Sequence, residues 1–234
     1  MDLKTVRLDL EPGAPVATLW LARPERLNAW TGRMHTELRW VMDELNRDDT
    51  TRVVILTGEG RGFCAGADSK ALESHVERGG YDPGTPADLA TPGFGVRPEL
   101  DADFAWMFGL KLVTIAAVNG PAAGVGLVMA CYADLMFVAE DAKLTTAHGK
   151  INLPAEYGLS WLLPRLVGLA RANDLLLSSR VFRGSEAAAM GLANAALPTD
   201  QVLAHAREYA EQLVTTVSPA SLATTKRQIA IDQL

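Results

Sequence analysis

The chain has 234 residues, of which 48% are hydrophobic and 21% are charged, and its formal net charge at pH 7 is -6. A chain of this length and composition can bury a hydrophobic core within one large domain. The acidic balance, without a basic run interleaved with aromatic residues, argues against a nucleic-acid-binding surface. Its two cysteines, Cys64 and Cys131, belong to no CxxC pair or Cys/His cluster. The sequence therefore predicts neither a disulfide framework nor a zinc site.

The chain shows no signature of a membrane protein. The first ten residues, MDLKTVRLDL, lack the apolar core of a signal peptide, and no apolar run is long enough to span a bilayer. Reducing conditions suit two unpaired thiols. The sequence therefore predicts a cytoplasmic protein without a membrane segment.

The first third of the chain alternates extended and helical patterns. Residues 6–10 and 16–21 are extended runs joined by the turn EPGAP, which predicts a hairpin. After the loop RPERLNAW, Thr31 is placed to cap a helix whose apolar residues recur every three or four positions. A buried-type strand over 52–57 follows, and the glycine-rich segment GEGRGFCAGAD leads from it towards a further helix.

The segment 113–139 contains a strand, a glycine turn, a helix and a second strand. Residues 113–118 (VTIAAV) form an almost entirely apolar run, typical of a strand buried on both faces. Asn119 and Gly120 end it. From Pro121 the apolar residues recur with helical spacing. A proline is tolerated at this position because the first turn of a helix needs no amide donor. A strand that runs into the start of a helix leaves unpaired N–H groups and the positive end of the helix dipole at one spot.

Both glycine loops are predicted to lie at one edge of a parallel sheet. Gly124 and Gly126 lack side chains, which lets a ligand approach the backbone at Val125. The loop that follows strand 52–57 repeats this plan, so the N–H groups of Ala67 and Val125 could bind one oxygen together. The alternative is a pair of tight turns whose small residues serve packing alone.

The remaining segments carry weaker patterns. Residues 79–98 are rich in Gly, Pro and Asp and predict either a loop over a site or a surface insertion, and residues 99–110 predict a helix. Residues 143–156 are irregular. Further helices are predicted over 158–167, 170–178, 185–190, 200–214 and 219–231, with a short extended piece over 191–197.

Several isolated polar residues and one cysteine are predicted to have structural positions without a catalytic role. Lys226 lies on an amphipathic helix and is predicted to be solvated, although it could approach a ligand phosphate. His35, His75 and His205 are predicted to be surface residues. Cys64 lies beside a glycine loop without a partnered base, which predicts a small buried apolar residue.

In order and spacing, the segments RPERLNAW, FCAGAD and VNGPAAGVGLVMACYAD resemble the crotonase superfamily, also called the enoyl-CoA hydratase/isomerase family. The runs EYGLSWLLPRLVG and FRGSEAAAMGLAN are similar to its later segments. The resemblance implies an α/β fold, with a crotonase-like spiral of ββα units over residues 1–195. It also implies a helical C-terminal region over 196–234 that mediates trimer or hexamer formation. Members usually continue beyond SPASLATTKRQI, so the family's C-terminal tail is expected to be disordered or absent here.

The resemblance implies an acyl-CoA thioester as substrate, with coenzyme A present only as part of that thioester and no bound cofactor or metal. The motif positions of Ala67 and Val125 are those of the two backbone donors that bind the enolate oxygen. The positions that match the family's CoA contacts are Arg26, Leu27, Ala29, Ala65 and Asp68.

The acid–base positions depart from the family's hydratases. Those enzymes usually carry two glutamates, and the matching positions here hold Val128 and His148. Glu156, in PAEYGLSW, resembles the position where several enoyl-CoA isomerases carry a single Glu or Asp. One carboxylate suffices for isomerisation, because it can take a proton from one carbon and return it to another. The sequence therefore predicts an enoyl-CoA isomerase with Glu156 as its acid and base.

Three other functions stay open at this point. The first is hydration by an altered acid–base set, and the second is C–C bond hydrolysis by a His148/Glu156 pair. The third is a non-catalytic acyl-CoA-binding protein that has kept the fold without the chemistry. Each of the two residues also has a non-catalytic interpretation. His148 could be a hydrogen-bonded loop residue, and Glu156 could be a capping or surface carboxylate.

Overall fold

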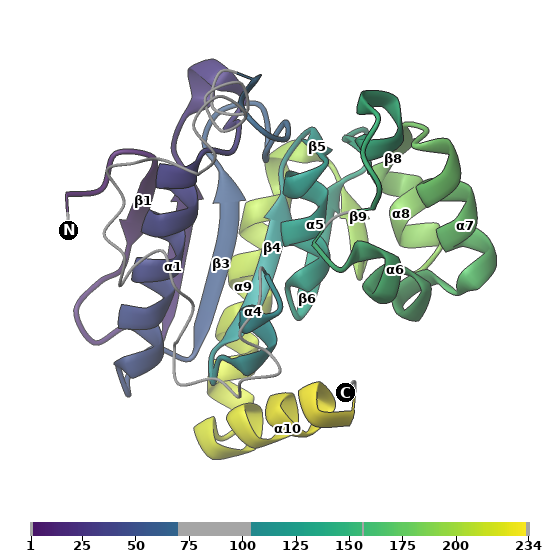
Figure 1. The fold of residues 1–234 in the computed structure, drawn as a ribbon. Helices are drawn as coiled ribbons and strands as arrows, with labels where there is room; N and C mark the ends of the chain where they lie inside the picture. The colour runs from purple at the N-terminus through teal and green to yellow at the C-terminus, as the bar shows by residue number, and fades with distance from the viewer. Residues whose placement is uncertain (1, 70–103, 156, 233–234) are drawn as a thin grey trace.

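A computed structural model describes residues 2–69, 104–155 and 157–232 of the chain. Its centre is a six-stranded sheet with the strand order β1-β2-β3-β4-β6-β9 (Figure 1). The strands of this sheet are β1 (Val6–Asp9), β2 (Val16–Leu21), β3 (Val53–Gly58), β4 (Val113–Val118), β6 (Leu135–Ala139) and β9 (Ala195–Leu197). A three-stranded sheet consists of β5 (Ala122–Ala123), β7 (Lys143–Thr145) and β8 (Phe182–Arg183).

The described helices surround these sheets. The α-helices are α1 (Gly32–Arg47), α4 (Trp106–Gly109), α5 (Val125–Tyr132), α6 (Leu159–Val167), α7 (Leu169–Ser178), α8 (Gly184–Ala189), α9 (Val202–Thr216) and α10 (Pro219–Asp232). The 3-10 helices are η1 (Pro24–Arg26), η3 (His148–Ile151) and η4 (Thr199–Gln201). None of them, within the described ranges, combines the length and the apolarity needed to cross a membrane.

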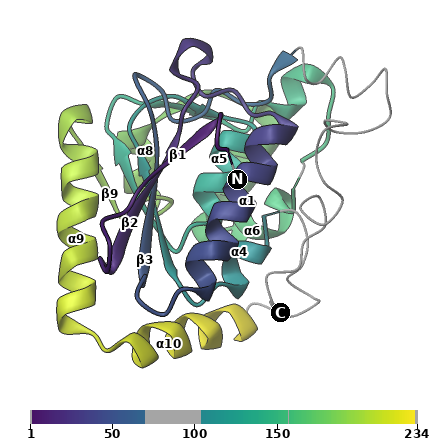
Figure 2. The same ribbon diagram turned by 90° about the vertical axis from the view of Figure 1, so that its left-hand side faces the viewer.

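The large sheet is buried between helices. Figure 2 shows α1 and α9 on opposite sides of its strands, with α10 running across the lower end. Every residue of β3 and β4 is buried, as their apolar sequences predict for strands covered on both faces. The sheet is parallel from β2 to β9, and β1 is the antiparallel edge strand. The hairpin predicted for the N-terminus is confirmed.

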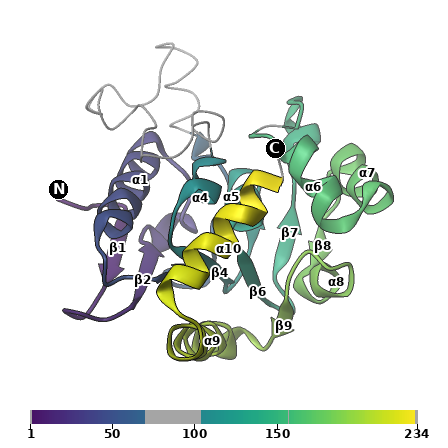
Figure 3. The same cartoon turned by 90° about the horizontal axis from the view of Figure 1, so that it is seen from below.

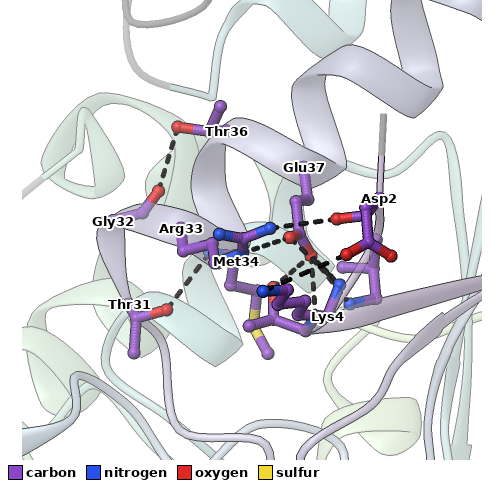
Figure 4. Close-up of polar contacts among 10 residues, drawn as sticks. Asp2, Lys4, Thr31, Gly32, Arg33, Met34, Thr36 and Glu37 are labelled. Carbon is purple, nitrogen blue, oxygen red and sulfur yellow. Dashed lines mark hydrogen bonds and ion pairs between the residues drawn. The ribbon is translucent and has the colours of Figure 1, made fainter. Parts of the chain in front are cut away.

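Helix α1 is anchored at its start, as Figure 4 shows. The Thr31 side chain accepts a hydrogen bond from the Met34 N–H and caps the helix as predicted. One turn later, the buried Glu37 carboxylate accepts from the Thr5 N–H (2.7 Å) and from the Lys4 N–H (3.1 Å), and it pairs with Arg33. Burial alone would raise the pKa of Glu37, but these hydrogen bonds hold it below its usual value. The carboxylate thereby joins β1 to α1.

The start of α5 corrects the prediction that a helix begins at Pro121. Ala122 and Ala123 instead form strand β5, paired with β7, and the helix starts at Val125. An apolar run of this length fits a helix as well as a strand, and only the partner strand distinguishes the two.

Three residues predicted to be solvated or on the surface are buried or partly buried. Lys226 is only 6% exposed, and its Nζ donates to the Leu112 carbonyl (2.6 Å) and to Asp134 Oδ2 (2.7 Å). The side chain predicted to be solvated therefore holds α10 against the core, where Figure 3 shows the helix crossing β4 from below. His35 is half-buried, and its ring meets the rings of Trp30 and Phe104. His205 is half-buried, with its ring centroid 4.7 Å from that of Phe137.

Several predictions fall outside the described residues. These are the glycine- and proline-rich loop of residues 79–98, the helix after Ser69, the first part of the helix over 99–110, and His75. The later helices lie within two residues of their predicted limits.

Candidate active site

The two glycine loops leave the same edge of the large sheet. β3 and β4 are parallel and paired in register, with Thr57 opposite Ala117, so residues 59–68 and 119–124 follow neighbouring strand ends. Asn119 joins the two loops. Its side chain accepts from the Gly58 N–H (3.2 Å) and donates to the Gly58 and Gly60 carbonyls (2.9 and 3.0 Å). The edge predicted from the sequence is therefore formed as expected.

The loops also contact each other through the backbone. Cys64 N–H donates to the Pro121 carbonyl (3.1 Å), and Ala123 N–H donates to the Cys64 carbonyl (3.0 Å). A Cβ at Gly126 would lie 2.3 Å from the Cys64 oxygen. Only glycine lets α5 approach the first loop this closely. Gly126 thus serves packing between the two loops.

The peptide group between Gly66 and Ala67 has a defined orientation. Trp30 N–H donates to the Gly66 carbonyl (2.8 Å), and Asp68 N–H donates to the Trp30 carbonyl (2.9 Å). In a trans peptide the C=O and the N–H point in opposite directions. The Ala67 N–H therefore points away from Trp30, and its residue is exposed.

The second candidate donor has the same kind of constraint. The Gly124 carbonyl accepts from Val128 N–H (3.0 Å), so the Val125 N–H of the same peptide points out of the start of α5. Gly124 has φ +50° and ψ -122°, a conformation that favours glycine. In the part of the chain that the structure describes, neither the Ala67 N–H nor the Val125 N–H donates to another backbone carbonyl. No backbone carbonyl of the described residues therefore competes with an external oxygen for either N–H.

The candidate CoA-contacting residues lie on two segments, the loop RPERLNAW and the first glycine loop, which are hydrogen-bonded to each other. Ala65 N–H donates to the Leu27 carbonyl (3.0 Å). Asn28, fully buried, donates from its side chain to the Glu59 and Gly62 carbonyls (3.0 and 2.8 Å). Of the predicted CoA contacts, Arg26 and Ala65 are exposed and Leu27, Ala29 and Asp68 are half-buried. The structure thus brings all five onto two adjoining segments.

Sequence reasoning missed Arg23 and Asn28. Arg23 Nη2 lies 3.0 Å from Asp68 Oδ2, with the two side chains 19% and 13% exposed. Asn28 has φ +55° and follows Leu27 at φ +49°. Asparagine is enriched at positive φ, so an Asn in a proline-containing turn was the available signal for such a buried anchor. Arg23 carried no comparable local signal.

The two positions that the resemblance matches to the hydratase glutamates contain no carboxylate here. Val128 is buried within α5. His148 is 9% exposed, and its Nε2 lies 3.1 Å from the Leu176 carbonyl. Because a carbonyl oxygen only accepts, Nε2 carries a proton in this contact, and the ring is tied to α7. This contact suits the structural interpretation of His148.

Glu156 lies outside the described residues. The backbone that follows it is described, and the Tyr157 carbonyl accepts a hydrogen bond from the Tyr132 hydroxyl (2.8 Å). A Cβ at Gly158 would lie 2.6 Å from that hydroxyl, and Gly158 has φ +70°. The hydroxyl at the end of α5 is therefore packed against the turn that begins α6.

The Cys64 thiol lies in the first glycine loop but is not in a reactive environment. Its side chain is fully buried, and burial raises the pKa of the thiol to about 11. A buried thiol that stays neutral at pH 7 is a poor nucleophile. Within the described ranges, no three His, Cys, Asp or Glu side chains are grouped so that they could hold a metal ion.

Comparison with known proteins gives a consistent family. The family model for enoyl-CoA hydratase/isomerase matches residues 11–232. The 1,2-epoxyphenylacetyl-CoA isomerase of Escherichia coli (strain K12) is 36% identical over 201 residues, covering 86% of this chain and 73% of its own length. A putative enoyl-CoA hydratase of Thermus thermophilus is 37% identical over 213 residues, covering 90% of this chain and 79% of its own.

Solved structures agree with these matches. A structure described as a monofunctional enoyl CoA isomerase from M. smegmatis has a TM-score of 0.77 and 31% identity, covering 99% of this chain and 94% of that one. An enoyl-CoA hydratase from Mycobacterium marinum has a TM-score of 0.74 and 36% identity, covering 97% of both chains. The crotonase-type α/β fold predicted from the sequence is thereby confirmed.

Proposed function

Because this chain belongs to the enoyl-CoA hydratase/isomerase family, we propose that it binds an acyl-CoA thioester and stabilises the thioester enolate with the N–H groups of Ala67 and Val125. The observation that carries this proposal is the orientation of these two peptide groups at one sheet edge. Each carbonyl of the pair is held by a backbone hydrogen bond, at Gly66 and at Gly124, so each N–H faces the other way. Donors fixed in advance need no rearrangement when charge develops on the thioester oxygen.

The favoured reaction is the shift of an enoyl-CoA double bond. Glu156 takes a proton from C2 of a 3-enoyl-CoA, the electron pair delocalises into a dienolate, and the same carboxyl group returns the proton at C4. The oxyanion donors hold the dienolate oxygen between the two steps. Substrate and product have the same composition, so no water or other reactant is consumed.

Two features favour isomerisation over two-glutamate hydration. Val128 has no ionisable group, and the His148 ring is bound to the Leu176 carbonyl through Nε2. A site with one carboxylate can shuttle a proton but lacks the second group that activates a water in the usual hydratase. Some relatives carry the isomerase name and others the hydratase name. Hydration by an altered acid–base set, C–C hydrolysis by His148 and Glu156, and binding without turnover remain the alternatives.

The proposal extends to the rest of the substrate. Arg26, Leu27 and Ala29 would contact the pantetheine and phosphates of coenzyme A, and Ala65 and Asp68 would lie near the adenine. Coenzyme A enters only as part of the thioester. The assembly we propose is a homotrimer or a dimer of trimers, with no nucleic-acid or membrane partner and a cytoplasmic location.

The reaction is tested by product analysis. The protein is incubated with a 3-enoyl-CoA and, separately, with a 2-enoyl-CoA, while product mass and conjugated-thioester absorbance are followed. We expect conjugation of the 3-enoyl-CoA without a mass change, and loss of this activity in Glu156→Gln. A mass gain of one water would identify a hydratase, and unchanged turnover in Glu156→Gln would exclude that residue as the base.

The oxyanion donor can be removed without changing a helix interior. Val125 is the first residue of α5, where proline is well tolerated because its missing N–H has no partner in the helix. Val125→Pro deletes the proposed donor, whereas the matched variant Val125→Ala keeps it. We expect kcat to fall about 10²–10³-fold in Val125→Pro and to change little in Val125→Ala. Equal rates in the two variants would contradict a role for this N–H.

A further inference from the structure

We propose that the Arg23 guanidinium acts through two peptide groups to orient and strengthen the Ala67 N–H as an oxyanion donor. The inference rests on the proposed oxyanion hole and adds a positioning residue to it. Arg23 is the residue before Pro24 in the loop RPERLNAW, where the CoA-contacting positions were predicted. Its side chain is 19% exposed and is engaged on two sides.

The first link joins the guanidinium to the peptide group between Ala29 and Trp30. Arg23 Nη1 donates to the Ala29 carbonyl at 2.6 Å. The N–H of that same peptide belongs to Trp30, and it donates to the Gly66 carbonyl at 2.8 Å. The Gly66 carbonyl in turn shares its peptide group with the Ala67 N–H. A positive charge is thus connected to the proposed donor by two consecutive peptide groups.

The direction of this chain determines its effect. A cation that donates to a carbonyl draws electron density from the peptide, which makes the N–H at its other end a stronger donor. Every bond in the chain runs from donor to acceptor in the same sense, so the polarisation adds along it. Condensed-phase estimates of such strengthening are about 10–30% per bond. The polarisation of both peptide groups therefore strengthens the Ala67 N–H as a donor, at the place where the thioester oxygen becomes negative.

Asp68 keeps the guanidinium in position. Its Oδ2 pairs with Arg23 Nη2 at 3.0 Å, and its own N–H donates to the Trp30 carbonyl at 2.9 Å. The planar fork of an arginine can hold a carboxylate and a carbonyl at once in fixed geometry, which a lysine ammonium does less well. The backbone of Arg23 is held as well, since its N–H donates to the Asn28 side chain at 2.8 Å. Both the guanidinium and the backbone of Arg23 are therefore held in place at the beginning of this series of hydrogen bonds.

A spectroscopic probe separates this role from a merely structural one. A 2-enoyl-CoA with a conjugated dimethylaminophenyl group absorbs at longer wavelength when its thioester oxygen accepts stronger hydrogen bonds. The wavelength of the saturated complex therefore reports donor strength independently of turnover and of Glu156. The variants are Arg23→Gln, which removes the charge, and Arg23→Lys, which keeps it. The matched control is Arg180→Gln, whose parent residue also pairs with two carboxylates, Asp174 and Glu186, but on α7 and α8.

We expect the bound probe in Arg23→Gln to lose a clear part of its red shift, with intermediate values in Arg23→Lys and no change in Arg180→Gln. In the isomerase assay kcat should fall roughly ten-fold, a fraction of the 10²–10³-fold that a whole oxyanion donor supplies, while KM changes by less than about two-fold. If Arg23→Gln fails to fold, the partial loss of red shift expected in Arg23→Lys, against no change in Arg180→Gln, still tests the proposal.

Each outcome has a separate meaning. An undiminished red shift in the Arg23 variants would overturn the proposed role of Arg23, even if their melting temperatures fall. No red shift in the wild-type complex would instead overturn the proposed oxyanion hole. A normal red shift in wild type together with unchanged turnover in Glu156→Gln would leave the Arg23 inference intact and reject the proposed base.

Discussion

One buried ammonium group joins α10 to the core. Lys226 Nζ donates to the Leu112 carbonyl and to Asp134 Oδ2, at 2.6 and 2.7 Å. The same carboxylate oxygen accepts from the Thr114 N–H and hydroxyl, at 2.7 and 2.8 Å. Burial lowers the pKa of Lys226, and the Asp134 carboxylate opposes that shift. Replacing Lys226 with methionine removes the charge and both hydrogen bonds while conserving most of the side-chain volume.

The size of the effect follows from what Asp134 retains. Removing one partner of a buried ion pair usually costs about 3–5 kcal/mol, because the other charge stays behind unpaired. Asp134 is 22% exposed in its side chain and keeps its two hydrogen bonds from Thr114, which places the cost at the low end. We therefore expect Lys226→Met to lower the free energy of unfolding by about 3 kcal/mol. For a chain of this size that corresponds to a melting temperature about 6–12 °C lower.

The assay is urea unfolding followed by tryptophan fluorescence, at one fixed protein concentration so that any assembly contributes equally. The control is Lys111→Met, because Lys111 pairs with an Asp49 side chain that is 99% exposed, and its loss should cost less than about 0.5 kcal/mol. The double variant Lys226→Met/Asp134→Asn should recover part of the loss, since the unpaired charge is gone. A Lys226→Met free energy within about 0.5 kcal/mol of wild type would refute the reasoning.

Two shorter predictions concern pH and packing. Burial lowers the pKa of His35 from 6.5 to about 4. The unfolded chain therefore binds more protons between those values, and stability should fall by up to about 3 kcal/mol as the pH drops through that window. Urea titrations at pH 4.5 and 7 should show less of this loss in His35→Gln, and an equal loss would contradict the assignment. Gly126→Ala should lower both the melting temperature and kcat, because its Cβ would lie 2.3 Å from the Cys64 oxygen. Gly191→Ala adds a Cβ with no atom within 4 Å, but at φ +84°, so it should lose stability through backbone strain and keep its kcat unchanged. An unchanged kcat in Gly126→Ala would rule out an effect of the clash on the loops.

Much of the fold could be predicted because it depends on local patterns. The N-terminal hairpin, the Thr31 cap and the buried strands β3 and β4 each follow from residues adjacent in the chain. The two glycine loops could be placed at one edge by the rule that parallel strands end together. The order and spacing of the motifs were enough to identify the family.

Contacts between distant segments decided the rest. Strand β5 exists because residues 122 and 123 pair with β7 and with Cys64. The apolar spacing of the chain does not show these partners, and it therefore predicts a helix from Pro121. Lys226 is buried because α10 lies against Asp134, 92 residues earlier in the chain. Arg23 reaches Asp68 across 45 residues. Periodicity describes which face of an element is apolar, but a buried charge depends on its partner, and only the tertiary structure brings the partners together.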